Sequence, residues 1–514
     1  MKKTISVITA VILIALAVAG CGSSNNAGNT DGANGKGSDK AKKTIVLSTI
    51  TGYYSTGLKE AAAAYHKLHP ETTVKIDIIS DNAAYKTNFD AKMSAGGKEA
   101  PDIVHTNLLG DMADYIDKGW LSKLNDFVNE PNEYNGGKTV FEGIDPAYHQ
   151  YSYDRNGNVG NLTFDLVGTG FYYNKDIFEK EGLEPPTTWE ELLDVAAKLK
   201  AKNYIPLALP NSVEGWMYGA FVDWSSRQMY PDLLILPGDA RYDEKVHKKN
   251  TTIKYAVDSP DFDFGAVYDP EKSINALKNK TYDNQSAAEK KWWSLLKQLS
   301  AFYQPGYQTL DDQSVYKLFI SQKAAMFYNG SWQVGSILAD QQKLGDKGFK
   351  WGTFKFPEFA QPDPLFPGKP RGILVPGHLL GVTQKEDAEQ MNRARDFLKY
   401  LYSKDVAQKL FERTLEVGEF VQGPSLVIGV TLPKEVNDYL EGFKVYGNMG
   451  GALTSASVGV VAEQQPAWNK NKFDFYAGKI TIEQFLKKKN EFAQKAADKT
   501  VKDNKYDLDP KTNP

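Results

Sequence analysis

Strands and helices alternate from the start of the folded part of this chain, and this alternation restricts the fold more than any other feature. Residues 44–48 form a short apolar run, residues 74–78 alternate apolar and polar side chains, and residues 101–104 begin a third strand-like segment. Apolar residues at helical spacing between 58 and 68 predict a helix that ends at Pro70, and a second helix precedes the third strand. This β-α-β-α-β order predicts a parallel sheet covered by helices, so the expected fold class is α/β.

Open parallel sheets bind ligands at the carboxyl ends of their strands, close to the point where the strand order reverses. In this chain three loops form that edge, at residues 51–54, 80–82 and 105–107. Their candidate ligand-binding residues are Tyr53, Asp81, Asn82, His105 and Asn107. Asp81, Asn82 and Asn107 could equally cap the helices that follow them, so the sequence leaves both roles open.

The folded part is too long for a single hydrophobic core. About 470 residues follow the N-terminal region, and this length predicts two lobes or domains. The formal net charge is −3 and no basic stripe occurs, so we expect no nucleic-acid partner. Aromatic residues make up 12% of the chain, with 28 Tyr, 25 Phe and 9 Trp, and such a share can line a ligand cleft as well as fill a core.

The N-terminal region carries the only cysteine of the chain. A short positive segment precedes an uncharged apolar stretch from Ile5 to Val18, which is shorter than the roughly 20 residues of a membrane-spanning helix. The residues Val18–Cys21 resemble a bacterial lipobox. We predict a signal peptide at 1–20, then a lipidated Cys21 and a flexible tether at 21–43, which would anchor the protein to the cell membrane on its extracytoplasmic face. An ordinary signal peptide with an incidental cysteine is the alternative.

Signatures of the common enzyme classes are incomplete in this sequence. Residues 136–139 end like a phosphate-binding loop without its upstream glycine, and residues 168–170 lack the third glycine of a dinucleotide-binding turn. Asp261 and Asp263 lack the glycine and the terminal glutamate of a calcium loop. We therefore expect no cofactor, no metal ion and no catalysis. Paired carboxylates stay open as an alternative, because the fold and not local spacing places the acids of glycosidases.

Four segments resemble the carbohydrate-binding solute receptors of bacterial ABC importers. The first is FYYNKDIFEKEGLEPPTTWEELLDVAAKLK, which contains a Tyr-Tyr-Asn-Lys turn and a Pro-Pro-Thr-Thr-Trp break before a helix. The others are APDIVHTN at 100–107, the tryptophan-bearing segment 319–338, and a glycine turn followed by a helix at 373–411. Two departures stand out, since the chain is long between 224 and 315 and the glycine turn carries His378. The resemblance therefore does not identify the substrate of this protein.

This resemblance implies a two-lobe periplasmic-binding-protein-like fold of type II, with lobes joined by hinge strands and multiple chain crossings. We place the crossings near Leu162–Phe164, Leu365–Arg371 and Thr431–Lys434. The expected first lobe is 44–163 plus 371–432, and the expected second lobe is 166–365 plus 433–514.

Sugars present apolar C–H faces and a rim of hydroxyl groups, so a receptor needs flat aromatic rings and rigid hydrogen-bonding groups. We predict Trp216 and Trp332 as platforms in the second lobe, and Tyr53 in the first; the resemblance places Trp332, and core packing is the alternative for each tryptophan. The predicted hydroxyl partners are Asp81, Asn82, Asn107 and Asp165, with Asn211, Glu214, Asn329 and His378 as weaker candidates.

The function implied by the resemblance is that of a membrane-anchored extracytoplasmic receptor, which closes around a sugar or oligosaccharide and delivers it to ABC permease subunits. The expected partners are thus a carbohydrate, the permease and, through the lipid anchor, the membrane, and we expect a monomer. A surface-tethered glycan-cleaving enzyme is one alternative. A receptor for a peptide or another non-sugar solute is the other.

Overall fold

The computed structural model describes residues 43–80, 82–154, 156–252, 268–366, 374–443, 460 and 462–512. These residues lie in a compact unit that runs from Lys42 to Pro514. The predicted signal peptide, Cys21 and the tether up to residue 42 lie outside the described residues, as do Asp81, Asp261 and Asp263. Within the described ranges, no helix combines the length and the apolar character needed to cross a membrane. The His, Cys, Asp and Glu side chains of these ranges form no group of three that could hold a metal ion.

The first sheet carries the N-terminal strands. Its order is β2 (Thr72–Ile79), β1 (Lys43–Ile50), β3 (Ile103–His105), β10 (Leu379–Val382) and β4 (Leu162–Thr163). Strand β1 pairs in parallel with β2 and β3, so that Leu47 lies opposite both Ile76 and Ile103. Strand β10 is antiparallel to β3 and β4. The parallel sheet predicted from residues 44–104 is confirmed for these three strands.

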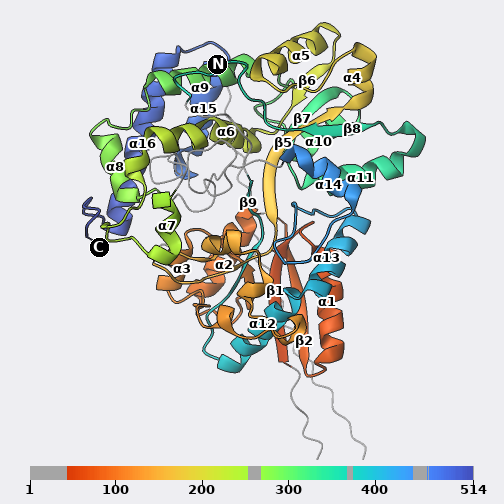
Figure 1. Ribbon diagram of the computed structural model, residues 1–514, viewed down its shortest axis with the longest axis vertical. Helices are drawn as coiled ribbons and strands as arrows, with labels where there is room; N and C mark the ends of the chain where they lie inside the picture. The colour runs from red at the N-terminus through yellow and green to blue at the C-terminus, as the bar shows by residue number, and fades with distance from the viewer. Residues whose placement is uncertain are drawn as a thin grey trace, which may run out of the picture. The chain divides into compact units, whose positions relative to one another are not determined.

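Helices on both faces complete the first sheet (Figure 1). They are α1 (Ser55–Leu68), α2 (Asn82–Ser94), α3 (Met112–Asp117), α12 (Ala388–Leu401) and α13 (Lys404–Glu416). Helix α1 buries Leu58, Ala61 and Tyr65, and its last residue precedes Pro70 by two positions, as the apolar spacing predicts. The ring of Tyr65 packs on Phe397 of α12 with centroids 5.0 Å apart.

The second sheet contains β6 (Ile205–Ala208), β7 (Ala324–Gly330), β5 (Leu166–Asn174) and β8 (Trp351–Phe354), in that order, and β9 (Leu374–Pro376) pairs with β5. Strands β6 and β7 are parallel, whereas β5 is antiparallel to β7, β8 and β9. Every described residue of β7 is buried, which is why this strand reads as an almost continuous apolar run.

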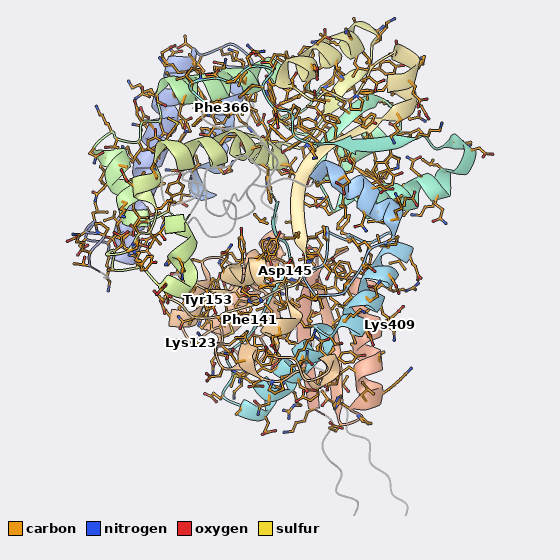
Figure 2. The ribbon with its side chains drawn as sticks, in the orientation of Figure 1. Lys123, Phe141, Asp145, Tyr153, Phe366 and Lys409 are labelled. Carbon is orange, nitrogen blue, oxygen red and sulfur yellow. The ribbon has the colours of Figure 1, made fainter. Side chains whose placement is uncertain are left out.

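The helices around the second sheet include α4 (Lys175–Glu181), α5 (Trp189–Ala201), α6 (Asn211–Met229), α10 (Asp312–Ile320), α11 (Gln333–Leu344) and α14 (Lys434–Leu440). Helix α5 begins with a capping box, because the Thr188 hydroxyl accepts a bond from the Glu191 amide and the Glu191 carboxylate accepts one from the Thr188 amide. Figure 2 shows Phe366 in the half of the molecule that contains the second sheet, and Phe141 in the half that contains the first sheet.

A helical elaboration extends the second-sheet side of the molecule. It consists of α7 (Glu244–Thr252), α8 (Pro270–Lys278), α9 (Ala287–Ser300), α15 (Gln465–Tyr476) and α16 (Ile482–Asn504). Leu234 and Ile274 pack with Ala493 of α16 in a small core of their own. The long insertion noted in the sequence is therefore held by the C-terminal helix, 200 or so residues away along the chain.

Three chain segments pass between the two sheets. The first passes at Phe164-Asp165, between β4 and β5, and the second at Gly377-His378, between β9 and β10. The third leads from Thr431, which bonds to Gln408 of α13, into α14, while Ser425 in the neighbouring segment 422–427 forms a bridge with Asp165. Strand β9 still pairs with β5, so the second change of sheet falls between residues 376 and 379, later in the chain than the expected 365–371. Helix α14 then packs on α11 and β8, close to the expected third crossing.

Candidate functional site

A cavity of about 580 Å³ opens where the two sheets face each other, beside the crossing segments. Its lining residues are Ile50, Thr51, Tyr53, Asn107, Leu108, Val167, Trp216, Asp312, Gln313, Trp332, Gln333, Val375, Pro376, Gly377, Phe420 and Gln422. Ile50, Thr51 and Tyr53 follow β1, and Asn107 and Leu108 follow β3. The cavity therefore uses two of the three loops predicted at the carboxyl edge of the parallel sheet. We call it the cleft.

Two tryptophans enter the cleft from the second-sheet side. Trp332 precedes helix α11, and a short link from β7 fixes its position, since the Ser331 amide donates to the Gly168 carbonyl at 2.8 Å. Trp216 lies in the second turn of α6. Both side chains are half-buried, so each keeps ring surface available to a ligand. The structure thus brings together the two tryptophans that the sequence nominated.

Tyr53 lines the opposite side of the cleft. It follows β1 and comes just before Tyr54, whose positive φ of 49° turns the chain into α1. Its ring meets His378 edge-on at 4.7 Å between centroids and Phe420 at 6.2 Å. Burial raises the pKa of the Tyr53 hydroxyl to about 12, with a further contribution from the negative charge of Asp165, so the hydroxyl stays protonated at neutral pH.

The polar groups of the cleft are mostly uncharged. Asn107 is exposed and its Oδ1 accepts a bond of 3.4 Å from the Leu379 amide. Gln333 and Gln422 are buried, and Gln422 Oε1 has no hydrogen-bond partner among the described residues. Sequence reasoning missed both glutamines, although Gln333 adjoins Trp332. Because Gln422 Oε1 is itself buried, it can accept a bond from a ligand hydroxyl only when its side chain turns toward the cleft.

Three predicted site residues lie away from the cleft lining. Glu214 is buried and pairs with Lys472 of α15, and Tyr307 donates to the same carboxylate at 2.5 Å. Asn211 accepts a bond of 2.6 Å from Lys472. Asn329 is buried, and its Oδ1 accepts from the Gly330 amide at 2.7 Å. Because Glu214 Oε2, Asn211 Oδ1 and Asn329 Oδ1 accept internal bonds and none of the three residues lines the cleft, they do not enter the site proposed below.

Three further predicted residues form a buried layer behind Tyr53. Asp165 is fully buried and His378 and His105 nearly so, and none of them lines the cleft. Nδ1 of His378 lies 2.7 Å from Asp165 Oδ2, and the rings of His105 and His378 are 5.1 Å apart. Of the loop at 80–82, Asp81 and the side chain of Asn82 lie outside the described residues.

The buried His105 makes stability depend on pH. Its burial lowers the pKa of the imidazole well below the ordinary value, and the neighbouring His378 lowers it further. The unfolded chain takes up a proton here at about pH 6.5 while the folded protein does not, so the free energy of unfolding falls as the pH drops below that value, by at most about 1.4 kcal/mol per pH unit. We expect His105→Gln to reduce this slope in urea titrations between pH 7.5 and 5.5.

The quantity to compare is the slope of unfolding free energy against pH in the wild-type protein and in the variant. Burial also lowers the pKa values of His149 and His247, but these histidines contribute equally to both proteins. Equal slopes in the wild-type protein and the variant would show that His105 does not carry the effect.

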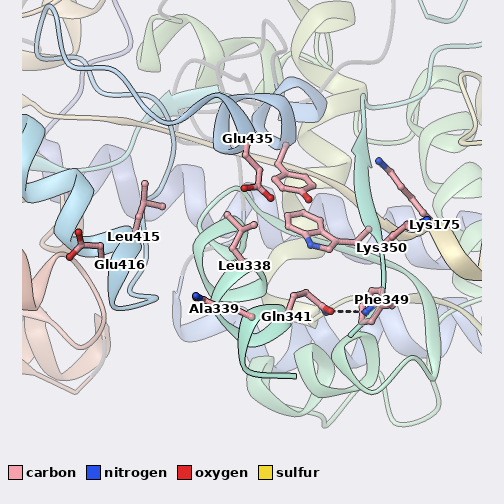
Figure 3. A pocket seen from close by; sticks show the side chains of 12 residues that line it. Lys175, Leu338, Ala339, Gln341, Phe349, Lys350, Leu415, Glu416 and Glu435 are labelled. Atoms are coloured by element: carbon pink, nitrogen blue, oxygen red, sulfur yellow. Dashed lines mark hydrogen bonds between the residues drawn. The ribbon is translucent and has the colours of Figure 1, made fainter. Parts of the chain in front are cut away.

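A larger groove of about 740 Å³ lies between α11, β8, α14 and the end of α13 (Figure 3). Its one tryptophan, Trp351, is buried and stacks on Tyr439 with centroids 3.6 Å apart and planes at 8°. Because another ring already covers the face of Trp351, this groove offers no open indole platform. The cleft, and not the larger groove, has the chemistry of a binding site for a solute with apolar faces.

Two sheets with three chain segments passing between them, and a cavity between the sheets, define a two-lobe solute-binding fold. Residues 51–408 match the family of bacterial extracellular solute-binding proteins, and the chain belongs to this family.

Two curated relatives and a solved structure illustrate the range of the similarity. The multiple sugar-binding protein of Streptococcus mutans serotype c is 25% identical over 357 residues, which cover 69% of this chain and 70% of the relative. The sn-glycerol-3-phosphate-binding periplasmic protein of Escherichia coli K12 is 29% identical over 141 residues, 26% of this chain and 31% of the relative. A solved chitin oligosaccharide binding protein aligns with a TM-score of 0.60 and 18% identity, over 89% of this chain and 100% of the other. The solved structure supports the type II fold expected from the sequence.

Proposed function

We propose that this protein is an extracytoplasmic receptor, anchored through a lipid on Cys21, that binds a sugar or oligosaccharide in the cleft and delivers it to an ABC permease. The observation that carries the proposal is the meeting of Trp216, Trp332 and Tyr53 in one cavity between the two sheets. Aromatic faces stack on the apolar C–H faces of sugar rings, and Asn107 and Gln422 supply amide groups for hydroxyls.

The charge of the cleft favours a neutral ligand. Among its described lining residues there is no Lys or Arg, and Asp312 is the one carboxylate. A phosphorylated solute such as the one named for the Escherichia coli relative needs cationic or clustered N–H partners, because a buried anion without them is strongly disfavoured. A neutral carbohydrate has no such requirement.

The same lining argues against glycan cleavage. Glycosidases place two carboxyl groups about 5–10 Å apart across the scissile bond. The described lining contributes Asp312 alone, and Asp165, another predicted site residue, is buried behind Tyr53 with its oxygens bonded to protein groups. The cleft therefore supports binding and delivery. A ligand that touches both lobes stabilises the closed form by its higher affinity for that form, and closure presents a changed surface to the permease.

Titration calorimetry with raffinose, maltotriose, xylotriose, chitotriose and glycerol 3-phosphate tests the assignment. We expect a neutral oligosaccharide to bind, and Trp332→Ala to raise its dissociation constant about 30-fold, since losing a buried aromatic anchor costs about 2 kcal/mol. Trp120→Ala is the matched control, because Trp120 is also half-buried but lies in a different groove.

Binding of glycerol 3-phosphate with no response to any neutral sugar would overturn the carbohydrate assignment. New reducing ends after incubation with the oligosaccharides would favour the enzyme. Equal losses in both tryptophan variants would remove Trp332 from the site.

A further inference from the structure

His378 and Asp165 join two of the crossing segments by a set of short bonds. The His378 amide donates to Asp165 Oδ1 at 2.8 Å, and Nδ1 of the same residue lies 2.7 Å from Oδ2, in the geometry of an N–H that donates to a carboxylate. Backbone bonds reinforce the link, since the Gly377 amide donates to the Asp165 carbonyl at 2.9 Å and the Phe164 amide to the His378 carbonyl at 3.0 Å. Both side chains are at most 1% exposed.

There is no spare room around this link. A Cβ on Gly377 would lie 2.7 Å from Asp165 Oδ1 and would overlap the end of the Gln422 side chain. Tyr54 donates its hydroxyl to Asp165 Oδ2 at 2.6 Å, so the carboxylate has protein donors on both oxygens. Because Nδ1 of His378 is bonded to Asp165, the His378 ring is held in one orientation.

The ring of His378 in turn packs on Tyr53, which lines the cleft. Its centroid lies 4.7 Å from that of Tyr53, with planes at 74°, and 4.8 Å from that of Tyr54. On another side lies the ring of His105, at 5.1 Å. Edge-on ring contacts of this kind fix the plane of a neighbouring ring. Tyr53 is the partner that reaches the cleft, so the plane it offers a ligand depends on His378.

We propose that His378 is a positioning residue, which Asp165 holds at the chain crossing and which sets the ring of Tyr53 in the cleft for ligand binding. The inference rests on the proposed function and deepens it, because it makes a residue that does not line the cleft determine affinity. It also ties the first-lobe platform directly to the segments that must bend when the lobes move.

Substitutions at position 378 separate the bond to Asp165 from the ring contact with Tyr53. Asparagine keeps an N–H donor at the position of Nδ1 but removes the ring edge that Tyr53 packs on. We expect His378→Asn to stay folded with a melting temperature lowered by a few degrees, because the shorter side chain leaves a small cavity, and to weaken oligosaccharide binding about tenfold. In a Tyr53→Ala background the same substitution should change affinity less than twofold, because the residue it positions is gone. His66→Asn on α1 is the matched control and should leave affinity unchanged.

A measurement without ligand completes the test. A 3-fluorotyrosine inserted at position 53 gives one ¹⁹F resonance, which we expect to shift or broaden in His378→Asn and to stay unchanged in His66→Asn. An unchanged resonance, or equal losses of affinity in the presence and absence of Tyr53, would overturn the inference. A wild-type protein that binds none of the sugars would overturn the proposed function instead, and the ¹⁹F result would still decide whether His378 positions Tyr53.

Discussion

Replacing Lys472 with alanine should lower the free energy of unfolding by about 3–5 kcal/mol. Lys472 and Glu214 form an ion pair in which the side chains are 6% and 2% exposed, so removing the lysine leaves the Glu214 carboxylate buried without its cationic partner. Tyr307 and Asn211 bond to this pair as well, which couples α6 and α15 through one buried network. Urea denaturation followed by far-ultraviolet circular dichroism measures the loss.

Two companion variants show whether the buried charge is the cause. Lys434→Ala removes an exposed lysine that pairs with Asp438 within α14, and it should leave the denaturation midpoint unchanged. The double variant Glu214→Met with Lys472→Met removes both charges and should recover most of the loss, since apolar side chains of similar volume can replace a buried pair. A double variant as unstable as Lys472→Ala would show that packing, and not the unpaired carboxylate, explains the loss.

Glu214 shows where local sequence reasoning fails. It stands two residues before Trp216, and this proximity in the sequence favours a place in the cleft for both residues. On a helix with 3.6 residues per turn, residues two apart point to nearly opposite sides, so the tryptophan that faces the cleft requires a glutamate that faces the interior. The partner of that glutamate, Lys472, lies 258 positions further along the chain, where no local pattern announces it.

The features that the sequence predicts well are those that short-range physics decides. Strand β2 follows from apolar alternation and strands β1 and β3 from short apolar runs, and the helices that begin after Thr188 and Thr481 follow from their capping boxes. The place of Tyr53 and Asn107 at the cleft follows from the strand ends of a parallel sheet, and the prediction of Trp332 comes from the family resemblance.

Long-range pairings account for most of what the sequence did not show. Strand β9 has three residues and is identified only by its pairing with β5, so the change of sheet at 377–378 could not be placed from periodicity. The sequence marks His378 as an unusual residue in a glycine turn. Its bonding to Asp165 joins residues 213 positions apart, and only the folded chain brings the two together.

The substitution Gly330→Ala should weaken oligosaccharide binding about 30-fold while the protein stays folded. Gly330 ends β7, and a Cβ built on it would overlap three carbons of the Trp332 ring, so the indole has to leave its place at the cleft wall. The half-buried ring can swing toward solvent, which is why the main loss falls on the ligand platform. Gly215→Ala on α6 is the matched control, because it stands beside Trp216 with no atom within 4 Å of the added methyl. Calorimetry with the bound sugar measures both variants, and wild-type affinity in Gly330→Ala would show that the observed position of Trp332 does not matter for binding.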